Sequence, residues 1–311
     1  MDFLKCIYYF FWSILFPPKE KDIDKTKFGL NSFLNIPLFG SPEEQLGMIE
    51  DLNVPIIRLL FNWNDDIQPE RDGECNWSFY DDIVYSLPEN VRAIAVLNGV
   101  PSWFEKGDNV GYFMEYCHKV MTRYSEEDKL IGYQIGNEPN SDMFIDNVKM
   151  QLIEHPENYI RLLYPIYDMS RKINKNKLII SAATTSIVQN YPDTMKYNKM
   201  LIELNIHKFC DVYAIHYYAD SWRGYFNLLR PGRVLELIKK IRRPICITEI
   251  GTGEFNEHKK FARTRIPFLF KKIKNLRYVF WYKFTGQERK FELKSINQEN
   301  SKLLDYLESI T

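Results

Sequence analysis

Short apolar runs recur along the chain at regular intervals from residue 28 onward. They are nearly continuously apolar, as strands buried on both faces of a parallel sheet are. Eight such runs cover residues 28–33, 55–61, 91–98, 130–137, 177–185, 211–219, 244–251 and 277–284. Their starts lie about 36 residues apart, which is the length of one strand, one crossover helix and two loops. The pattern therefore predicts eight consecutive strand–helix units.

Segments with helical character fall between the runs. Ser41 precedes Pro42 and two glutamates, a pattern typical of an N-cap and the first turn of a helix. Further helices are expected over residues 110–124, 158–173, 197–204, 231–241, 261–273 and 301–310. Eight parallel units predict a closed (β/α)8 barrel. An open doubly wound sheet is the alternative, but no glycine-rich phosphate-binding turn follows the first run.

Composition and charge narrow the classes of partner. The 311 residues include 41 basic and 41 acidic side chains, so no net field attracts nucleic acid, and no nucleic-acid partner is expected. The five cysteines form no CxxC and the five histidines form no HxH, so we expect neither a metal nor another cofactor. No Pro/Gly-rich break divides residues 28–311, which we take as a single domain.

The N-terminal 18 residues form an apolar segment, joined to the first strand by a polar linker over residues 19–27. Residues 6–16 are apolar, but they are too few to span a bilayer and no small-x-small cleavage site follows them. Three interpretations stay open: a membrane-associating or export segment, a helix packed on the closed end of the barrel, or an interaction tail. The first of these favours an extracytoplasmic or membrane-associated location over a cytoplasmic one.

Two strand ends carry a carboxylate where an apolar run meets its loop. The fourth run ends in Asn137-Glu138-Pro139, and the seventh ends in Thr248-Glu249. An ionisable group at such a position is costly unless it is used or paired. The fourth and seventh of eight strands face each other across the mouth of a barrel, where active sites form. A facing pair of carboxylates is the minimum set for cleaving a glycosidic bond.

Asn137-Glu138-Pro139 on the fourth strand and Glu249 on the seventh resemble clan A of the glycoside hydrolases, the retaining 4/7 barrels, and within it families 39 and 5. The resemblance covers about residues 28–311. It implies a glycosidase that acts on a poly- or oligosaccharide by double displacement. Glu138 would be the acid/base and Glu249 the nucleophile. A catalytically inactive carbohydrate-binding barrel is the alternative; a metal-dependent hydrolase would need ligand clusters that the sequence lacks.

Further side chains at strand ends follow the same resemblance. It implies that Arg58 supports the nucleophile, that Tyr218 contacts Glu249, and that Asn137 binds the sugar 2-hydroxyl. It also implies that a tryptophan of the eighth strand floors the sugar subsite. The remaining candidates for substrate binding or support are Trp281 for that floor, His216 beside Tyr218, Trp103 after the third strand, and Asn98 at its end. His216 could instead be a hydrogen-bonded core histidine, and both tryptophans could be core aromatics.

Overall fold

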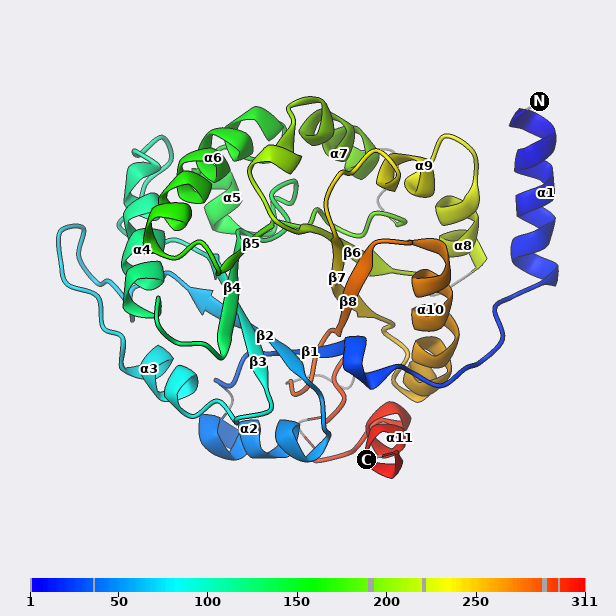
Figure 1. Ribbon diagram of the computed structural model, residues 1–311, viewed down its shortest axis with the longest axis horizontal. Coiled ribbons are helices and arrows are strands. Elements are labelled where there is room, and N and C mark those ends of the chain that lie inside the picture. The colour runs from blue at the N-terminus through cyan, green and yellow to red at the C-terminus, as the bar shows by residue number, and fades with distance from the viewer. Residues whose placement is uncertain are drawn as a thin grey trace.

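The computed structural model describes residues 2–35, 37–189, 193–219, 222–286, 290–295 and 297–310. Eight parallel strands form one sheet in the order β5-β4-β3-β2-β1-β8-β7-β6, and helices surround it (Figure 1). This arrangement confirms the predicted (β/α)8 barrel. The strands are β1 (Phe28–Ser32), β2 (Ile56–Asn62), β3 (Arg92–Asn98), β4 (Leu130–Ile135), β5 (Leu178–Ser181), β6 (Tyr213–Tyr218), β7 (Ile245–Gly251) and β8 (Leu276–Trp281).

The barrel closes between β5 and β6 through few contacts. A parallel bridge joins Ile180 to Val212. The backbone N–H of Ser181 donates to the carbonyl of Val212 at 3.1 Å. Asp211 Oδ2 accepts from the backbone N–H of Ile179 at 2.8 Å. These bonds satisfy backbone groups that two sheet edges would otherwise leave unpaired.

Side chains on the strands alternate between the barrel interior and the helical layer. On β2, Ile56 lies in the small interior core, whereas Ile57 and Leu59 belong to the large core between strands and helices. Arg58 therefore points inward, because successive side chains on a strand face opposite sides. The interior core is apolar at one end of the barrel, and polar side chains occupy the other end.

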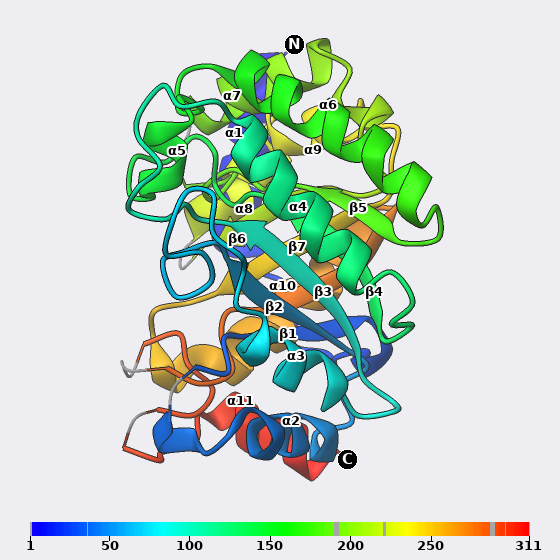
Figure 2. The same cartoon turned by 90° about the vertical axis from the view of Figure 1, so that its left-hand side faces the viewer.

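Seven of the outer helices match the segments that the sequence predicted. Ser41 is the N-cap of α2, as expected, and it forms a capping box: its hydroxyl accepts from Glu44 N–H, and the Glu44 carboxylate accepts from Ser41 N–H. The matching helices are α2 (Pro42–Asp51), α4 (Gly111–Arg123), α6 (Pro156–Ile173), α7 (Asp193–Glu203), α9 (Val234–Ile238), α10 (His258–Lys272) and α11 (Lys302–Ser309). Figure 2 shows α4 and α6 side by side on the outer layer.

Three helices within the barrel domain were not predicted: α3 (Ser78–Tyr85), α5 (Ile145–Lys149) and α8 (Trp222–Leu229). The long connection between β4 and β5 holds α5 and α6, and α5 lies just beyond the end of β4. The eighth strand ends at Trp281, three residues before the end of the predicted apolar run. The presence of α5 and the earlier end of β8 both change which side chains lie at the mouth of the barrel.

The N-terminal segment forms α1 (Asp2–Leu15), which stands beside the barrel next to α8 (Figure 1). Phe10 contacts Trp222 of α8 edge to face, and Trp12 stacks on Phe268 of α10. One of the three interpretations was a helix packed on the closed end of the barrel. In the structure, α1 instead packs on the side of the barrel, against α8 and α10. No helix in the described ranges is long and apolar enough to cross a membrane.

The polar stretch between α1 and β1 is tied to the barrel at both of its ends. Arg263 of α10 forms ion pairs with Glu20 and Asp22. Lys25 Nζ donates to the carbonyls of Leu52 and Leu307, each at 2.9 Å. The linker therefore holds the first strand against helices from both ends of the chain.

Candidate active site

A cavity of about 480 Å³ opens where the carboxyl ends of the strands meet. This is the end at which barrel enzymes carry their active sites. Six of the side chains singled out from the sequence line it: Arg58, Asn98, Asn137, Glu138, Tyr218 and Glu249. They come from β2, β3, β6 and β7 and from the loop after β4, so the tertiary structure brings them together from across the whole chain.

Glu249 enters the cavity because the pairing of β6 with β7 slips by one residue. Ile215 pairs with Ile247, but His216 pairs with Glu249, so Thr248 is the extra residue of a bulge. Cys246 faces the barrel interior, and strict alternation would have turned Thr248 inward and Glu249 outward. The bulge reverses this order, as bulges beside active sites commonly do.

Two donors hold the Glu249 carboxylate in place. Arg58 Nη1 lies 3.0 Å from Oε1, and both side chains are almost fully buried. The Tyr218 hydroxyl donates to Oε2 at 2.7 Å. Burial of that hydroxyl and the negative charge of Glu249 raise the pKa of Tyr218 well above its ordinary value, so Tyr218 stays a donor. One cationic and one neutral donor therefore fix the carboxylate, which lines the cavity.

Arg58 is itself positioned by polar side chains from three other strands or loops. Its Nε donates to Gln134 Oε1 at 2.9 Å, and its Nη2 donates to Asn137 Oδ1 at 2.8 Å. Nη1 also donates to Asn31 Oδ1. Asn31 Nδ2 in turn donates to the carbonyl of Thr248 beside Glu249 at 2.9 Å. The guanidinium thus connects β1, β4 and β7 around one carboxylate, as its planar fork of donors allows.

Glu138 has a left-handed backbone, with φ of 43°, which is uncommon for a residue other than glycine. Its N–H donates to the carbonyl of Ala183 at 2.9 Å. Asn147 Nδ2 donates to the carbonyls of Glu138 (2.7 Å), Ser141 (3.1 Å) and Asn137 (3.3 Å). These bonds hold the strained turn, and strain of this kind is concentrated at functional sites.

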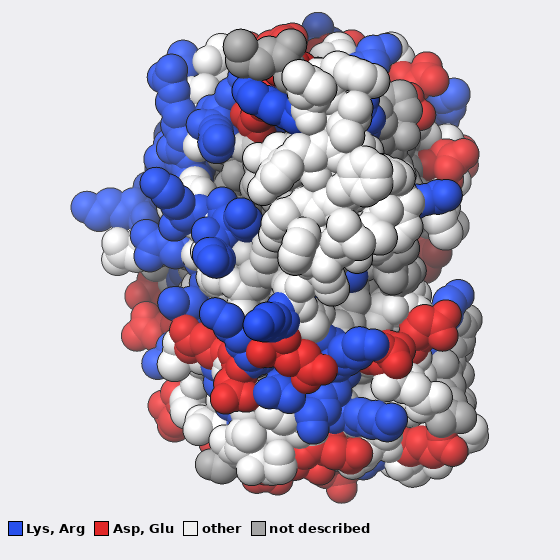
Figure 3. Space-filling view, turned by 90° about the vertical axis from the view of Figure 1, so that its right-hand side faces the viewer, with Lys and Arg blue, Asp and Glu red and all other residues white. Residues whose placement is uncertain are grey.

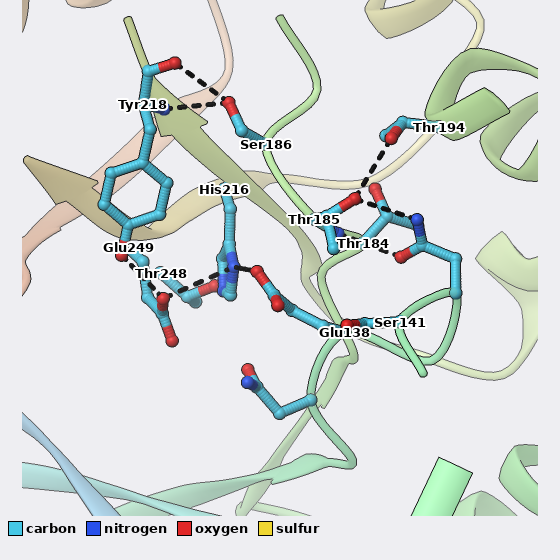
Figure 4. Close-up of polar contacts among 12 residues, drawn as sticks. Glu138, Ser141, Thr184, Thr185, Ser186, Thr194, His216, Tyr218, Thr248 and Glu249 are labelled. Atoms are coloured by element: carbon cyan, nitrogen blue, oxygen red, sulfur yellow. Dashed lines mark hydrogen bonds and ion pairs between the residues drawn. The ribbon is translucent and has the colours of Figure 1, made fainter. Parts of the chain in front are cut away.

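The two carboxylates approach each other around His216 (Figure 4). His216 is fully buried, and its Nδ1 lies 2.8 Å from Glu138 Oε1 and 3.5 Å from Glu249 Oε2. One oxygen of Glu138 lies within 4.8 Å of one oxygen of Glu249. Retaining glycosidases place their carboxyl groups about 5–5.5 Å apart, whereas inverting enzymes need about 6.5–9.5 Å to admit a water. The pair matches the retaining geometry.

Comparison with known proteins agrees with this geometry. The family model described as Cellulase (glycosyl hydrolase family 5) matches residues 43–283. The chain belongs to glycosyl hydrolase family 5. This confirms the resemblance to clan A that the strand ends indicated, and the chain is a glycoside hydrolase. No curated protein shows significant sequence similarity to it.

Solved structures share the fold at low sequence identity. A family 39 glycoside hydrolase from Bacteroides cellulosilyticus WH2 is 15% identical with a TM-score of 0.64; the match covers 93% of this chain and 64% of that one. Xylanase 10B from Thermotoga petrophila RKU-1 is 18% identical with a TM-score of 0.63, covering 94% and 98%. Endo-glycoceramidase II from Rhodococcus sp. is 14% identical with a TM-score of 0.64, covering 94% and 81%.

The family 5 barrel places two of the predicted aromatic residues away from the cavity. Trp281 is fully buried and packs on His258 and Phe261, so it is a core residue and not the floor of a sugar subsite. On β8, Phe280 faces the interior and Trp281 the helical layer, so alternation turns Tyr282 into the cavity. Trp103 donates from Nε1 to the carbonyl of Gln68 and also lies outside the cavity lining.

Asn98 lies at the end of β3, and its side chain is nearly buried. Its Oδ1 has no hydrogen-bond donor among the described residues, although it lines the cavity. A buried acceptor without a donor is costly unless a ligand supplies one. Asn98 therefore borders the cavity with an acceptor that no described protein group uses.

Several side chains of the site were missed at the level of sequence. Aromatic and apolar groups complete the cavity wall: Phe33, Leu60, Met143, Phe144, Tyr282 and Phe291. Asn31 and Gln134, which hold Arg58, are polar residues inside otherwise apolar strands. That mismatch is a signal in the sequence that could have identified them. Asn147 lies on α5, which no pattern indicated.

The cluster of Glu138, His216 and Glu249 is also the one set of potential metal ligands found among the described residues. Glu249 already accepts from Arg58 and Tyr218, and the Arg58 guanidinium is a cation at 3.0 Å. A metal ion at the same place would meet that positive charge. The donor set therefore suits an organic substrate better than a divalent ion.

Proposed function

We propose that this family 5 protein hydrolyses a poly- or oligosaccharide with retention of configuration, using Glu249 as nucleophile and Glu138 as acid/base. The separation of the two carboxylates, within 4.8 Å, is the observation that carries this proposal. A gap of that size leaves no room for the water that an inverting enzyme places between substrate and base.

In the first half of the reaction, Glu249 attacks the anomeric carbon and Glu138 protonates the departing oxygen. Arg58 and Tyr218 hold the Glu249 carboxylate in place until the bond forms. In the second half, Glu138 removes a proton from water, which attacks the same carbon and releases Glu249. His216 Nδ1 contacts Glu138 at 2.8 Å and holds its carboxyl group toward the substrate in both halves.

The side chains that line the cavity suit a sugar. Asn98 and Asn137 supply amide groups for hydroxyls, and Phe33, Tyr282 and Phe291 supply aromatic surfaces for ring faces. Because Asn137 Oδ1 accepts from Arg58, its Nδ2 remains the group that donates to the sugar 2-hydroxyl. A bond to that hydroxyl strengthens in the transition state.

The proposal is tested with an activated 2-deoxy-2-fluoro glycoside, which forms the glycosyl-enzyme but hydrolyses slowly. We expect the protein to gain the mass of one sugar, and peptide mapping to place it on Glu249. Glu249→Gln should block labelling. Glu138→Gln should still be labelled by substrates whose leaving group needs no proton. A panel of such glycosides covers different sugars, and the Glu254→Gln variant, altered at a carboxylate outside the cavity lining, serves as the control.

The inactive carbohydrate-binding alternative predicts the opposite result. A barrel without a working nucleophile would bind saccharides and take up no label with any glycoside. Labelling at a residue other than Glu249 would contradict the assignment of the nucleophile but not the membership of family 5. Release of the product as the opposite anomer, followed by NMR, would contradict the retaining mechanism.

A further inference from the structure

Helix α1 concentrates exposed apolar side chains on one side of the molecule. Of the sixteen large hydrophobic residues that are exposed in the described part of the chain, nine lie between residues 3 and 16. The most exposed of these nine are Phe3 (76%), Leu4 (71%) and Leu15 (63%). Contiguous exposed apolar surface of this kind marks an interaction site in a soluble protein.

Only one face of α1 is covered by the barrel. Phe10 contacts Trp222 and Phe226 of α8, and Trp12 stacks on Phe268 of α10. The opposite face, with Leu4, Phe11 and Leu15, has no ring contact to the barrel in the described ranges. A helix of 14 residues is about 21 Å long, shorter than the roughly 30 Å of a bilayer's hydrocarbon core. It can lie along a membrane surface but cannot span one.

Two basic segments lie together at the end of the barrel where the strands begin. Residues 230–243 and 265–277 contain eleven basic residues and one acidic residue, Glu236. They precede the neighbouring strands β7 and β8, and Asn275 Nδ2 donates to the carbonyl of Arg243 at 2.6 Å. Seven of the basic side chains are exposed and have no carboxylate partner among the described residues; we call them the basic edge: Lys239, Lys240, Arg242, Lys271, Lys272, Lys274 and Arg277.

The basic edge adjoins α1. A groove of about 350 Å³ is lined by Trp12 and Phe16 on one side and by Lys271 and Lys272 on the other. Figure 3 views the side on which α1 stands, and shows a broad area without charged groups that is bordered at one edge by basic side chains with few acidic ones. Apolar and cationic surfaces therefore form one continuous face.

We propose that this face binds the surface of an anionic lipid membrane, with α1 in the interface and the basic edge over the headgroups. An apolar helix alone or a charge cluster alone gives weak, reversible attachment, whereas the two together give stable binding. The exposed aromatic residues of α1, among them Tyr8 and Phe11, suit the boundary between headgroups and acyl chains. Because the protein has no net charge, attraction to anionic lipid depends on this local cluster.

A vesicle sedimentation assay tests the proposal with the full chain. Vesicles of phosphatidylcholine alone are compared with vesicles that also contain phosphatidylglycerol. We expect binding to the second kind, and loss of that binding as salt is raised. The apolar variant Leu4→Ser/Phe11→Ser/Leu15→Ser and the charge variant Lys239→Gln/Lys240→Gln/Lys271→Gln/Lys274→Gln should each bind at least about tenfold more weakly.

Matched controls alter exposed residues elsewhere. Tyr85→Ser/Tyr164→Ser/Ile310→Ser removes exposed apolar groups outside α1, and Lys106→Gln/Lys175→Gln/Lys196→Gln/Lys199→Gln removes four exposed lysines outside the basic edge. Both should bind vesicles like the unaltered protein. Thermal melting confirms that each variant is folded, and hydrolysis of a soluble activated glycoside reports separately on the active site.

Three results would overturn the proposal. In the first, the unaltered protein stays in the supernatant with both kinds of vesicle. In the second, it sediments equally with both kinds, which shows that the basic edge does not contribute to binding. Light scattering could instead show a dimer that the apolar variant abolishes while vesicle binding is absent, in which case a second copy of the chain covers α1.

Discussion

Arg58 on β2 and Glu249 on β7 form a buried ion pair, with Nη1 and Oε1 3.0 Å apart. The two residues are 191 positions apart in the sequence. Arg58 Nε and Nη2 donate to Gln134 and Asn137, and Nη1 also donates to Asn31, so all three guanidinium nitrogens have a partner. The pair links the barrel's stability to its chemistry, because the same contact neutralises a buried carboxylate and orients the proposed nucleophile.

Replacing Arg58 by methionine should lower both stability and activity. Removing one partner of a buried pair leaves an uncompensated charge, and the free energy of unfolding should fall by about 3–5 kcal/mol. Urea unfolding measures this change. Lys172→Met breaks an exposed pair with Asp168 and should lower the free energy of unfolding far less than Arg58→Met does. Equal losses in the two variants would contradict the account of Arg58.

Replacing Tyr218 by phenylalanine should reduce catalysis more than stability. The variant loses the 2.7 Å hydrogen bond to Glu249 Oε2, and a bond to a charged group contributes about 1.5–3 kcal/mol, or roughly tenfold to a hundredfold in kcat/KM. Tyr217→Phe is the matched control on the same strand, since the buried Tyr217 hydroxyl has no partner in the described part of the chain. Steady-state kinetics on both variants makes the comparison, and unchanged kcat/KM in Tyr218→Phe would refute the role.

We expect Asn147 to position Glu138, because its amide donates to three carbonyls of the loop that carries this proposed acid/base. Asn147→Ala should lower the free energy of unfolding by about 1–3 kcal/mol. It should also slow the cleavage of substrates with poor leaving groups. Activated aryl glycosides need little protonation, so they should be cleaved at nearly the normal initial rate.

The difference between the two substrate types separates a positioning role from general damage to the fold. Asn158→Ala, which removes an amide that donates to the carbonyl of Gln151 outside the cavity, should leave both rates unchanged. If Asn147→Ala slows the two substrate types equally, the loop does not depend on this amide for the placement of Glu138.

Asp146 should make the protein less stable as pH rises from acid toward neutral. Burial raises the pKa of its carboxyl above the ordinary value of 3.8, so the folded state holds the proton more tightly than the unfolded chain. Stability from this group is therefore greatest below pH 3.8 and falls as the pH rises through 3.8 to the raised value. Unfolding measured across this range should show a shallower decline in Asp146→Asn, which keeps an acceptor for Gly99 N–H.

The exposed Asp142 supplies the control for this measurement. Asp142→Asn removes one exposed carboxylate close by in the chain, so it shows how much of any change in Asp146→Asn comes merely from the loss of one negative charge. Parallel curves for Asp146→Asn and the unaltered protein would show that the buried carboxyl contributes nothing to the pH dependence of stability.

Most of the barrel could be predicted because its signals are local. Continuous apolar runs predict buried parallel strands, and Ser41 with Glu44 predicts the start of α2. The helices that were missed are short or lie where the chain turns: α5 has five residues, and its hydrophobic positions give no clear period. Asn147 lies on α5 and was missed with it, because its bond to the Glu138 carbonyl exists only once the loop between the two residues has folded.

The sequence by itself determined the fold and the two carboxylates at the ends of strands four and seven, and the resemblance to clan A added the arginine on strand two. The fold and the strand ends depend on residues that are close together in the chain, so hydrophobic periodicity is enough to find them. The tertiary structure decided which side chains face the cavity. One extra residue in β7 turns Glu249 inward, and alternation on β8 puts Tyr282 and not Trp281 at the site. It also brought the two basic segments beside α1, because only folding sets the distance between residues far apart in sequence.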